Sequence, residues 1–333
     1  MENEETLEVY ITKWMDEIKF DPYLQLLTAQ SMNRIRSTVR THIIKNIGHY
    51  KLKDLNHLII QKEMINVMIK SGLSYSSVKK ARDALNDCLS YALNARHLLY
   101  SPMPLVRLPS KAIYKRREGM NRPKLFSPEE LQRFEDAIQK RRPDGQYLLA
   151  NGWGFYLMLQ CGARSGEATA WTWDDYGEEI VDGEVIVMLH IDKTVITTID
   201  PGRKPKFRIE IQNHPKTKNS VRNVYLNSAG MHAILELRKI SKGRYIIDNV
   251  KGELLSPGCV AKNFSRIMRH AGIKGHSIHD LRHTYGTKLF MSGIPMKLGA
   301  EILGQGDVGV YLDHYVTIID PAKREAMRKI KFE

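Results

Sequence analysis

His276-Ser-Ile-His-Asp-Leu-Arg-His-Thr-Tyr285 is the stretch from which the rest of the chain can be interpreted. Ser277 is a favoured helix-capping residue, and the apolar residues after it recur with the helical period. On such a helix His279 and Arg282 are three residues apart, so they share one face. A neutral imidazole beside a permanently charged guanidinium suits a phosphate that must be held and also supplied with a proton. The stretch therefore predicts half of a phosphate-handling site.

The charge of the chain favours a polyanionic partner. Its 333 residues suffice for two domains, each with its own core. Lysine and arginine outnumber the acidic residues by 51 to 37, a formal net charge of +14. Nucleic acid is the first partner that such an excess suggests. A basic enzyme with no nucleic-acid partner is the alternative that charge alone leaves open.

Cysteine usage and hydropathy indicate a cytoplasmic setting. Cys88, Cys161 and Cys259 are widely separated, which is typical of reduced thiols and not of a disulfide framework or a cysteine-based zinc site. The first 30 residues contain no apolar run, and no stretch approaches ~18 uninterrupted apolar residues. We therefore expect no signal peptide and no membrane span.

Residues 1–105 predict an all-α domain. Amphipathic patterns indicate four helices, at residues 6–20, 29–47, 56–70 and 75–97. Ser101-Pro-Met-Pro104 then breaks the helical pattern.

Residues 106–124 predict a basic linker. Within residues 111–124, six basic residues face a single acidic one, Glu118; they are Lys111, Lys115, Arg116, Arg117, Arg122 and Lys124. Each phosphate that such a tether neutralises releases counterions, so we expect these six residues to contact a DNA backbone. An extended, self-repelling linker is the alternative.

Residues 125–333 predict an α+β domain. Ser127, Pro128 and Glu130 form a helix-start signature for a helix that ends near residue 142. Further helices are expected at residues 147–160, 229–240, 258–271, 278–291, 295–303, 307–315 and 321–330. Strand patterns at residues 184–199, 207–212 and 221–226 indicate a small antiparallel sheet, with residues 214–220 as a hairpin loop. The predicted fold class is mainly α with a small antiparallel sheet.

Four segments of this region resemble motifs of the tyrosine recombinase, or phage integrase, family. Gly162-Ala-Arg-Ser-Gly-Glu167 is similar to the first arginine motif of the family, and Pro215-Lys-Thr-Lys-Asn-Ser-Val-Arg222 is similar to its lysine hairpin. His279-Asp-Leu-Arg-His-Thr284 is nearly the His-x-x-Arg box, and Leu303-Gly-Gln with Asp313-His-Tyr315 resembles the end of the family pattern. The resemblance implies an N-terminal core-binding, SAM-like bundle that binds DNA, an α+β catalytic domain and a C-terminal tail at residues 316–333.

The resemblance also implies a reaction and its residues. The chain would be a site-specific DNA recombinase that cuts and rejoins DNA through a 3′-phosphotyrosyl intermediate, with no cofactor and no metal. Tyr315 would be the nucleophile. Arg164 and Arg282, with their fork-shaped donors, would grip the phosphate and stabilise its transition state. His279 would take the tyrosine proton, and Lys216 would protonate the departing 5′-oxygen.

Three of these assignments have open alternatives. Lys218 competes with Lys216 as the general acid, and Tyr311 lies one helical turn before Tyr315. Where the family usually has His, or sometimes Trp, this chain has Gln305. A glutamine amide can donate a hydrogen bond to phosphate but cannot carry a proton, so we expect Gln305 to position the phosphate.

Other functions remain compatible with parts of the pattern. His279-Asp-Leu-Arg-His283, with His276 nearby, resembles a zinc-protease helix, but cationic Arg282 beside a metal is unfavourable. A non-cleaving DNA-binding protein of the same fold, a Xer-type resolvase and a type IB topoisomerase are further alternatives. Glu167 either orients the Arg164 guanidinium or is a plain helix-start carboxylate.

The resemblance finally implies partners. They are double-stranded DNA and a homotetramer on two DNA sites, with accessory DNA-bending or directionality factors, in the nucleoid of a bacterial host. We expect integration and excision of a phage or other mobile element, because the region 182–226 is long. The tail after Tyr315 would dock either on a neighbouring protomer or in cis.

Overall fold

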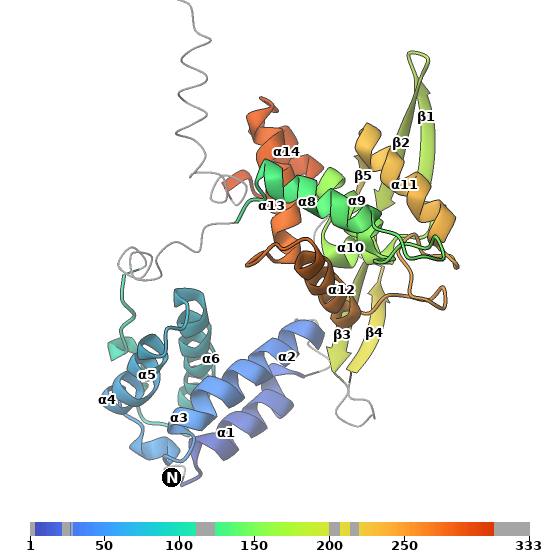
Figure 1. The fold of residues 1–333 in the computed structure, drawn as a ribbon. Coiled ribbons are helices and arrows are strands. Elements are labelled where there is room, and N and C mark those ends of the chain that lie inside the picture. The colour runs from blue at the N-terminus through green and yellow to red at the C-terminus, as the bar shows by residue number, and fades with distance from the viewer. Residues whose placement is uncertain are drawn as a thin grey trace, which may run out of the picture. The chain divides into compact units, whose positions relative to one another are not determined.

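The computed structural model describes residues 4–21, 27, 29–110, 124–199, 207–213 and 220–309. The chain divides into two compact units, of which the first comprises residues 1–121 with 198–206 and the second residues 122–197 with 207–333 (Figure 1). Most of the expected basic linker, residues 111–123, lies outside the described residues. Within the described parts of the chain, no helix is both long and apolar enough to cross a lipid bilayer.

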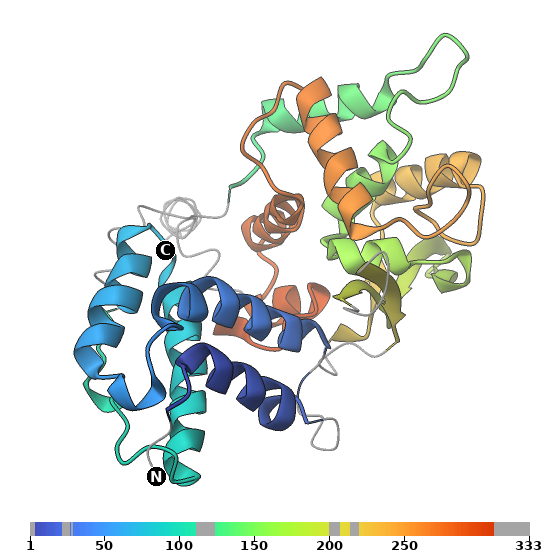
Figure 2. The ribbon, with the colours of Figure 1, turned by 90° about the horizontal axis from the view of Figure 1, so that it is seen from below.

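The first unit is a helical bundle (Figure 2). Its first helix consists of α1 (Leu7–Trp14) and a π-helical turn at Met15–Lys19. The second is formed by α2 (Ala29–Thr38), a π-helical turn at Val39–Ile44 and α3 (Lys45–Ile47). The third is formed by α4 (His57–Ile59), a π-helical turn at Ile60–Ile65 and α5 (Asn66–Lys70). The fourth, α6 (Tyr75–Asn94), begins at Ser74, whose hydroxyl accepts from the N–H of Ser77 at 3.2 Å.

A single apolar core holds this bundle together. Each helix contributes fully buried side chains, among them Leu7, Ile43, Met64 and Leu85. Short 3-10 turns at Leu52–Asp54 and Met103–Leu105 connect or follow the helices. The four helices that periodicity predicts are therefore confirmed, because each has one apolar face and these faces meet.

The second unit is built around α9 (Gly152–Cys161). This helix is apolar on all sides and almost wholly buried, and it contacts α8 (Pro128–Gln139), α10 (Ser165–Ala170), α11 (Ser228–Ile240), α12 (Pro257–His270) and α13 (Ile278–Met291). A helix that is apolar all round needs such complete cover. Figures 1 and 2 show the surrounding helices from two sides. The last described helix, α14 (Met296–Ile302), packs on α13.

Two helix boundaries differ from the expectation. The helix expected at residues 147–160 begins only at Gly152, and α8 ends at Gln139 and not near residue 142. Tyr147 instead pairs with Arg141 in an isolated β-bridge, and its buried hydroxyl donates to Glu236 at 2.6 Å. This tertiary contact holds residues 141–147 out of helical conformation. The helices expected at residues 307–315 and 321–330 lie almost wholly outside the described residues.

The strands form two antiparallel sheets in place of the single sheet that was expected. β1 (Tyr176–Val181), β2 (Glu184–Ile191) and β5 (Arg222–Tyr225) make a three-stranded sheet in the order β1-β2-β5. β3 (Thr194–Ile199) and β4 (Phe207–Gln212) make a two-stranded sheet. The hairpin expected between residues 207–212 and 221–226 is therefore wrong in its pairing. The segment with the candidate lysines connects two different sheets, and residues 214–219 of it lie outside the described residues.

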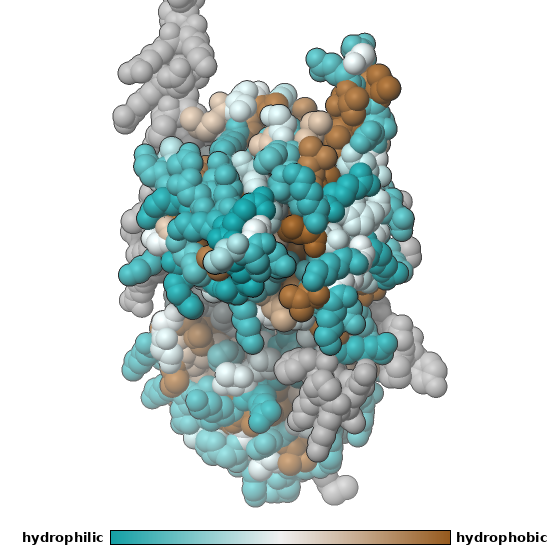
Figure 3. Space-filling model, turned by 45° about the vertical axis from the view of Figure 1, so that its right-hand side comes forward, coloured by the Kyte–Doolittle hydropathy of each residue, from teal (hydrophilic) through white to brown (hydrophobic). Residues whose placement is uncertain are grey.

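The β1–β2 hairpin projects from the second unit (Figure 1). Asp182 and Gly183 both have positive φ, +53° and +82°, as the tight turn between the strands requires. Apolar side chains lie exposed near this turn, as the brown group over the hairpin shows (Figure 3). They include Ile180 and Val185, which are cross-strand neighbours.

Candidate active site

Three of the predicted site residues line one cavity. The cavity has a volume of about 410 Å³, and Arg164, His279 and Arg282 are on its wall. Arg164 immediately precedes α10, whereas His279 and Arg282 lie in the first two turns of α13. Residues more than one hundred positions apart in the sequence are thus brought together.

The capping of α13 fixes the direction of its first turn. Ser277 and Asp280 form a capping box, in which the Ser277 N–H donates to the Asp280 carboxylate at 2.7 Å. Asp280 is buried, whereas His279 beside it is exposed on the cavity wall. His279 also meets His283 edge to face, with 4.6 Å between the ring centroids.

Arg282 is held by backbone carbonyl groups. Arg282 is buried, with only 3% of its surface exposed. One Nη donates to the carbonyl oxygen of Gly162 at 2.9 Å and the other to that of Leu303 at 2.6 Å. Gly162 ends α9 in the left-handed conformation, with φ of +67°. A Cβ at Gly162 would lie 2.4 Å from the ring of Tyr285, so only glycine allows α9 and α13 to meet there.

Arg164 is half-exposed toward the cavity and anchored from behind by Glu167. The guanidinium donates to Glu167 Oε1 at 2.7 Å, and the backbone N–H of Arg164 donates to Oε2 at 2.9 Å. A second guanidinium nitrogen donates to the carbonyl oxygen of Gly304 at 3.2 Å. The Arg164 side chain is 40% exposed and that of Glu167 only 6%. Glu167 is therefore both the carboxylate that caps the start of α10 and the partner that orients the Arg164 guanidinium.

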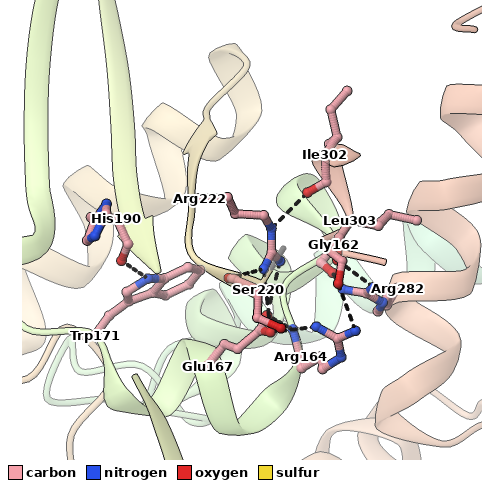
Figure 4. A network of polar contacts seen from close by, with 11 residues as sticks. Gly162, Arg164, Glu167, Trp171, His190, Ser220, Arg222, Arg282, Ile302 and Leu303 are labelled. Carbon is pink, nitrogen blue, oxygen red and sulfur yellow. Dashed lines mark hydrogen bonds and ion pairs between the residues drawn. The ribbon is translucent and has the colours of Figure 1, made fainter. Parts of the chain in front are cut away.

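A third arginine, Arg222, completes this network (Figure 4). It lies at the start of β5, and its Nη2 contacts Glu167 Oε2 at 3.0 Å with its side chain 8% exposed. Its Nε donates to the carbonyl oxygen of Ile302 at 2.9 Å, and Nη1 donates to that of Ser220 at 3.1 Å.

The electrostatics of Glu167 follow from its burial between two cations. Burial alone would raise the pKa of this carboxyl group, but the ion pairs with Arg222 and then Arg164 outweigh it. The pKa is therefore lower than the usual value, and Glu167 is a carboxylate at neutral pH. Burial in the same region raises the pKa of the Cys161 thiol to about 12, so this thiol stays protonated.

Gln305 follows the turn that receives the three arginines. Its backbone N–H donates to the carbonyl oxygen of Ala300 at 2.8 Å and so closes the end of α14. Its side-chain Oε1 is buried and has no hydrogen-bond partner among the residues that the structure describes. The preceding residues, Leu303 and Gly304, accept from Arg282 and Arg164 respectively. Gln305 therefore adjoins the arginine-bearing part of the site.

His276 packs within the structure close to the cavity. Its ring stacks on Phe126 with 4.0 Å between centroids, and its Nε2 lies 3.3 Å from a carboxylate oxygen of Glu130. The N–H of Phe126 donates to the Thr284 hydroxyl at 3.2 Å, so the chain that leaves the linker is fastened to α13. In the described part of the chain, no cluster of three His, Cys, Asp or Glu side chains has the geometry to hold a metal ion.

Several predicted site residues lie outside the described residues. They are Lys111, Lys115, Arg116, Arg117, Lys216, Arg122 and Tyr315, together with the rival residues Lys218 and Tyr311. Lys124 is described and is exposed, as a phosphate-contacting residue must be.

Arg222 is the residue of this network that the sequence interpretation missed. It ends the segment that resembles the lysine hairpin, but no role was assigned to it. The sequence does contain one indication of its role. Arg222 lies within an alternating strand, and an arginine that is buried there needs a carboxylate partner.

The arrangement suits phosphoryl chemistry. Two guanidinium groups and one imidazole face the same cavity, while a buried carboxylate and backbone carbonyl oxygens hold the arginines in place. Fixed donors of this kind stabilise a phosphate whose charge grows in the transition state.

Known protein sequences are similar to most of this chain. The sequence profile described as "Phage integrase family" matches residues 124–319. A XerC-like tyrosine recombinase of Caldanaerobacter subterraneus subsp. tengcongensis is 26% identical over 86% of this chain and 74% of its own length. The ICEBs1 integrase of Bacillus subtilis is 25% identical over 86% of this chain and 75% of its own length.

Solved structures share the fold. The Tn1549 transposon integrase, in complex with a circular intermediate DNA, superposes with a TM-score of 0.73 at 16% identity, covering 98% of this chain and 100% of that one. The lambda integrase tetramer bound to a Holliday junction gives a TM-score of 0.64 at 19% identity, covering 93% of this chain and 78% of that one.

The predicted fold class, mainly α with a small antiparallel sheet and an α-helical region before the catalytic domain, is confirmed by these likenesses, although the strands are divided between two small sheets. Because the family profile spans more than half of the chain, the chain belongs to the phage integrase family of tyrosine recombinases, enzymes that transfer DNA strands.

Proposed function

We propose that this recombinase integrates and excises a mobile element by site-specific strand exchange, with Tyr315 as its nucleophile. The observation that carries the proposal is the meeting of Arg164, His279 and Arg282 on one cavity. Two arginines and a proton-exchanging imidazole are the groups that a tyrosine attacking a phosphodiester requires. A phenol titrates near ~10, so it needs nearby cations and a base to react at neutral pH.

The proposed cleavage step is a transesterification. The hydroxyl oxygen of Tyr315 attacks the phosphorus, and its proton passes to His279. The bond from phosphorus to the 5′-oxygen breaks, and Lys216 protonates that leaving oxygen. Arg164 and Arg282 hold the non-bridging oxygens while their negative charge increases. The 3′-phosphotyrosyl bond retains the energy of the phosphodiester, so a 5′-hydroxyl from another strand rejoins the DNA without a nucleotide, a cofactor or a metal.

The first unit and the basic linker are proposed to hold the DNA. Residues 1–105 would act as the core-binding domain, residues 125–333 as the catalytic domain, and residues 106–124 would cross the sugar–phosphate backbone between them. Binding should weaken steeply with salt, because each neutralised phosphate releases counterions. Strand exchange requires two sites that are each cut on both strands, so four protomers should assemble on double-stranded DNA, with accessory DNA-bending or directionality factors. The lambda integrase tetramer on a Holliday junction is consistent with this count.

A role in a mobile element is favoured over a Xer-type role by one feature. Along the sequence, a separate two-stranded sheet, β3–β4, lies between β2 and β5 and makes the region 182–226 long. The similarity to a protein named ICEBs1 integrase also favours a role in a mobile element. The similarity to a XerC-like recombinase keeps a resolvase as the second candidate. The two functions differ in substrate: an integrase joins two dissimilar sites, and a resolvase acts on two copies of one site.

A nicked suicide substrate tests the proposal. Cleavage next to the nick releases a short strand, so the covalent protein–DNA adduct cannot reverse and accumulates. The adduct should form with the unaltered chain and with Tyr311→Phe, and it should be lost in Tyr315→Phe. Loss of the adduct in Tyr311→Phe alone would identify Tyr311 as the nucleophile and contradict the proposal.

The same substrate decides between the two lysines. Lys216→Ala should slow adduct formation by roughly 10²-fold or more, as removal of a general acid does, whereas Lys218→Ala should have a smaller effect. A defect confined to Lys218→Ala would reverse the assignment. Deletion of residues 318–333 separates docking of the tail on a neighbouring protomer from docking in cis, because unchanged tetramer formation on DNA would contradict docking on a neighbouring protomer.

A further inference from the structure

The buried guanidinium of Arg222 joins three segments of the chain next to Arg164. Arg222 contacts Glu167, which also pairs with Arg164 (Figure 4). It also donates to the carbonyl oxygen of Ile302, at the end of α14, and to the carbonyl oxygen of Ser220, shortly before β5. Both Nη atoms and Nε donate in these contacts, so each of the three nitrogens of the planar guanidinium makes a hydrogen bond. A lysine ammonium, which is a single point donor on a flexible stem, has no equivalent geometry.

The charges of the cluster show what this contact achieves. Glu167 carries one negative charge and pairs with Arg164 at 2.7 Å. If Arg164 were its only partner, the carboxylate would cancel most of the positive potential that Arg164 presents to a phosphate. Arg222 shares the same carboxylate at 3.0 Å, and the three side chains together carry a net charge of +1. Both buried members lie behind Arg164, which is the exposed member of the three and faces the cavity.

We propose that Arg222 is a positioning residue that neutralises Glu167, so that Arg164 keeps both its orientation and its positive potential toward the scissile phosphate. This inference rests on the proposed function, because it presumes that Arg164 binds the phosphate. Glu167 fixes the Arg164 guanidinium, and Arg222 removes the electrostatic penalty of that fixation. Arg222 itself does not touch the substrate.

Two simpler roles compete with this one. Arg222 would be a plain structural anchor if its loss only weakened folding. It would act on leaving-group protonation if its contact with Ser220 mattered more than its contact with Glu167. The three roles predict different responses to changes in the substrate and in Glu167.

The experiment compares the rate of adduct formation by three variants on two suicide substrates. The variants are Arg222→Met, the double variant Glu167→Gln with Arg222→Met, and Lys193→Met. Lys193 is the matched control, because it makes a partly buried ion pair with Asp175 at 2.6 Å in the same unit and contacts no residue of the Arg222 cluster in the described chain. One substrate has a normal scissile phosphate and the other a methylphosphonate, in which a neutral methyl group replaces one charged oxygen. All rates are normalised to the folded fraction measured by circular dichroism.

The proposal predicts a charge-dependent defect. Arg222→Met should react roughly 10- to 100-fold more slowly than the unaltered chain on the normal phosphate, somewhat less than the loss of a direct donor. On the methylphosphonate this ratio should fall to within about 3-fold, because less charge develops there and less cationic stabilisation is needed. The added Glu167→Gln change should restore part of the rate on the normal phosphate, because it removes the unbalanced carboxylate. Lys193→Met should react like the unaltered chain on both substrates.

Each other outcome overturns the proposal. Equal ratios on the two substrates, or a double variant slower than Arg222→Met, would make Arg222 a plain anchor. A third suicide substrate, a 5′-bridging phosphorothiolate whose sulfur leaves without a proton, is added to test the remaining role. Recovery of Arg222→Met on this substrate but not on the methylphosphonate would assign Arg222 to leaving-group protonation. If the unaltered chain forms no adduct with a normal phosphate, the proposed function itself fails. If that adduct forms and Arg222→Met matches it, only the inference fails.

Discussion

Gly304→Ala is expected to disturb the site by displacing Arg222. Gly304 has φ of +64°, and a Cβ added there would lie 2.5 Å from Arg222 Nη1 and 2.9 Å from its Cζ. An alanine in the left-handed region costs about 1–2 kcal/mol. Displacement of the guanidinium also weakens hydrogen bonds made by a charged donor, each worth about 1.5–3 kcal/mol. With one such hydrogen bond lost, the total loss in free energy of unfolding should be about 2.5–5 kcal/mol.

Gly293→Ala provides the matched control. Gly293 follows the end of α13 as Gly304 follows the end of α14, and it has φ of +78° with no atom within 4 Å of an added Cβ. Its replacement should cost only the backbone term of about 1–2 kcal/mol. Urea unfolding followed by circular dichroism measures both losses, and adduct formation should fall in Gly304→Ala alone.

Combination with Arg222→Met sharpens the test. Once the guanidinium is absent, Gly304→Ala should cost no more than Gly293→Ala, since the remaining term is backbone strain. Equal losses of stability for the two alanine variants in the unaltered background would refute the close packing of Gly304 on Arg222. An undiminished cost of Gly304→Ala in the Arg222→Met background would refute it as well.

Three further predictions concern charge, exposure and hydrogen bonding. The pKa of Glu167 is lowered, so its stabilising contribution is complete above the usual pKa of 4.5 and is lost as the pH falls through the folded-state pKa. The unfolding free energies of Glu167→Gln and the unaltered chain should thus converge as the pH drops below about 4.5, and divergence would contradict the ion-pair account. Iodoacetamide should modify exposed Cys259 in the native protein before buried Cys161, as mass spectrometry can determine, and equal rates would contradict the burial of Cys161. Gln305→Ala should slow adduct formation by roughly 10-fold, because one hydrogen bond to phosphate is lost, whereas Gln305→His should retain activity. Equal rates for both variants would show that Gln305 does not contact the phosphate.

Local signals in the sequence predicted most helices of both units. Ser74, Ser127 and Ser277 each cap the helix that follows, and Gly162 ends α9 with a positive φ. Such features depend on residues close in the chain, so a single sequence contains them.

Features that depend on distant partners were not predicted. The alternating residues of β4 indicate a strand but not its neighbour, and β4 pairs with β3 while β5 pairs with β2. Tyr147 leaves the helical pattern because its hydroxyl meets Glu236, which lies 89 residues away.

The candidate site shows the same division. Arg164, His279 and Arg282 were identified through local motifs, and the structure brings them to one cavity. Arg222 was missed because its partners Glu167 and Ile302 are 55 and 80 residues distant. Its place in an alternating strand indicated that a buried arginine there would need a carboxylate partner, but not which carboxylate.

The identity of the residue that becomes linked to DNA tests the central claim most directly. The adduct formed on a suicide substrate, in the presence of a metal chelator, is digested with trypsin and nuclease and analysed by tandem mass spectrometry. Tyr311 and Tyr315 fall in the same tryptic peptide, so fragment ions must separate them. We predict a nucleotide on Tyr315 and a 5′-hydroxyl on the released strand. A nucleotide on another residue, or strand cleavage that leaves a 5′-phosphate and no linked protein, would contradict the account.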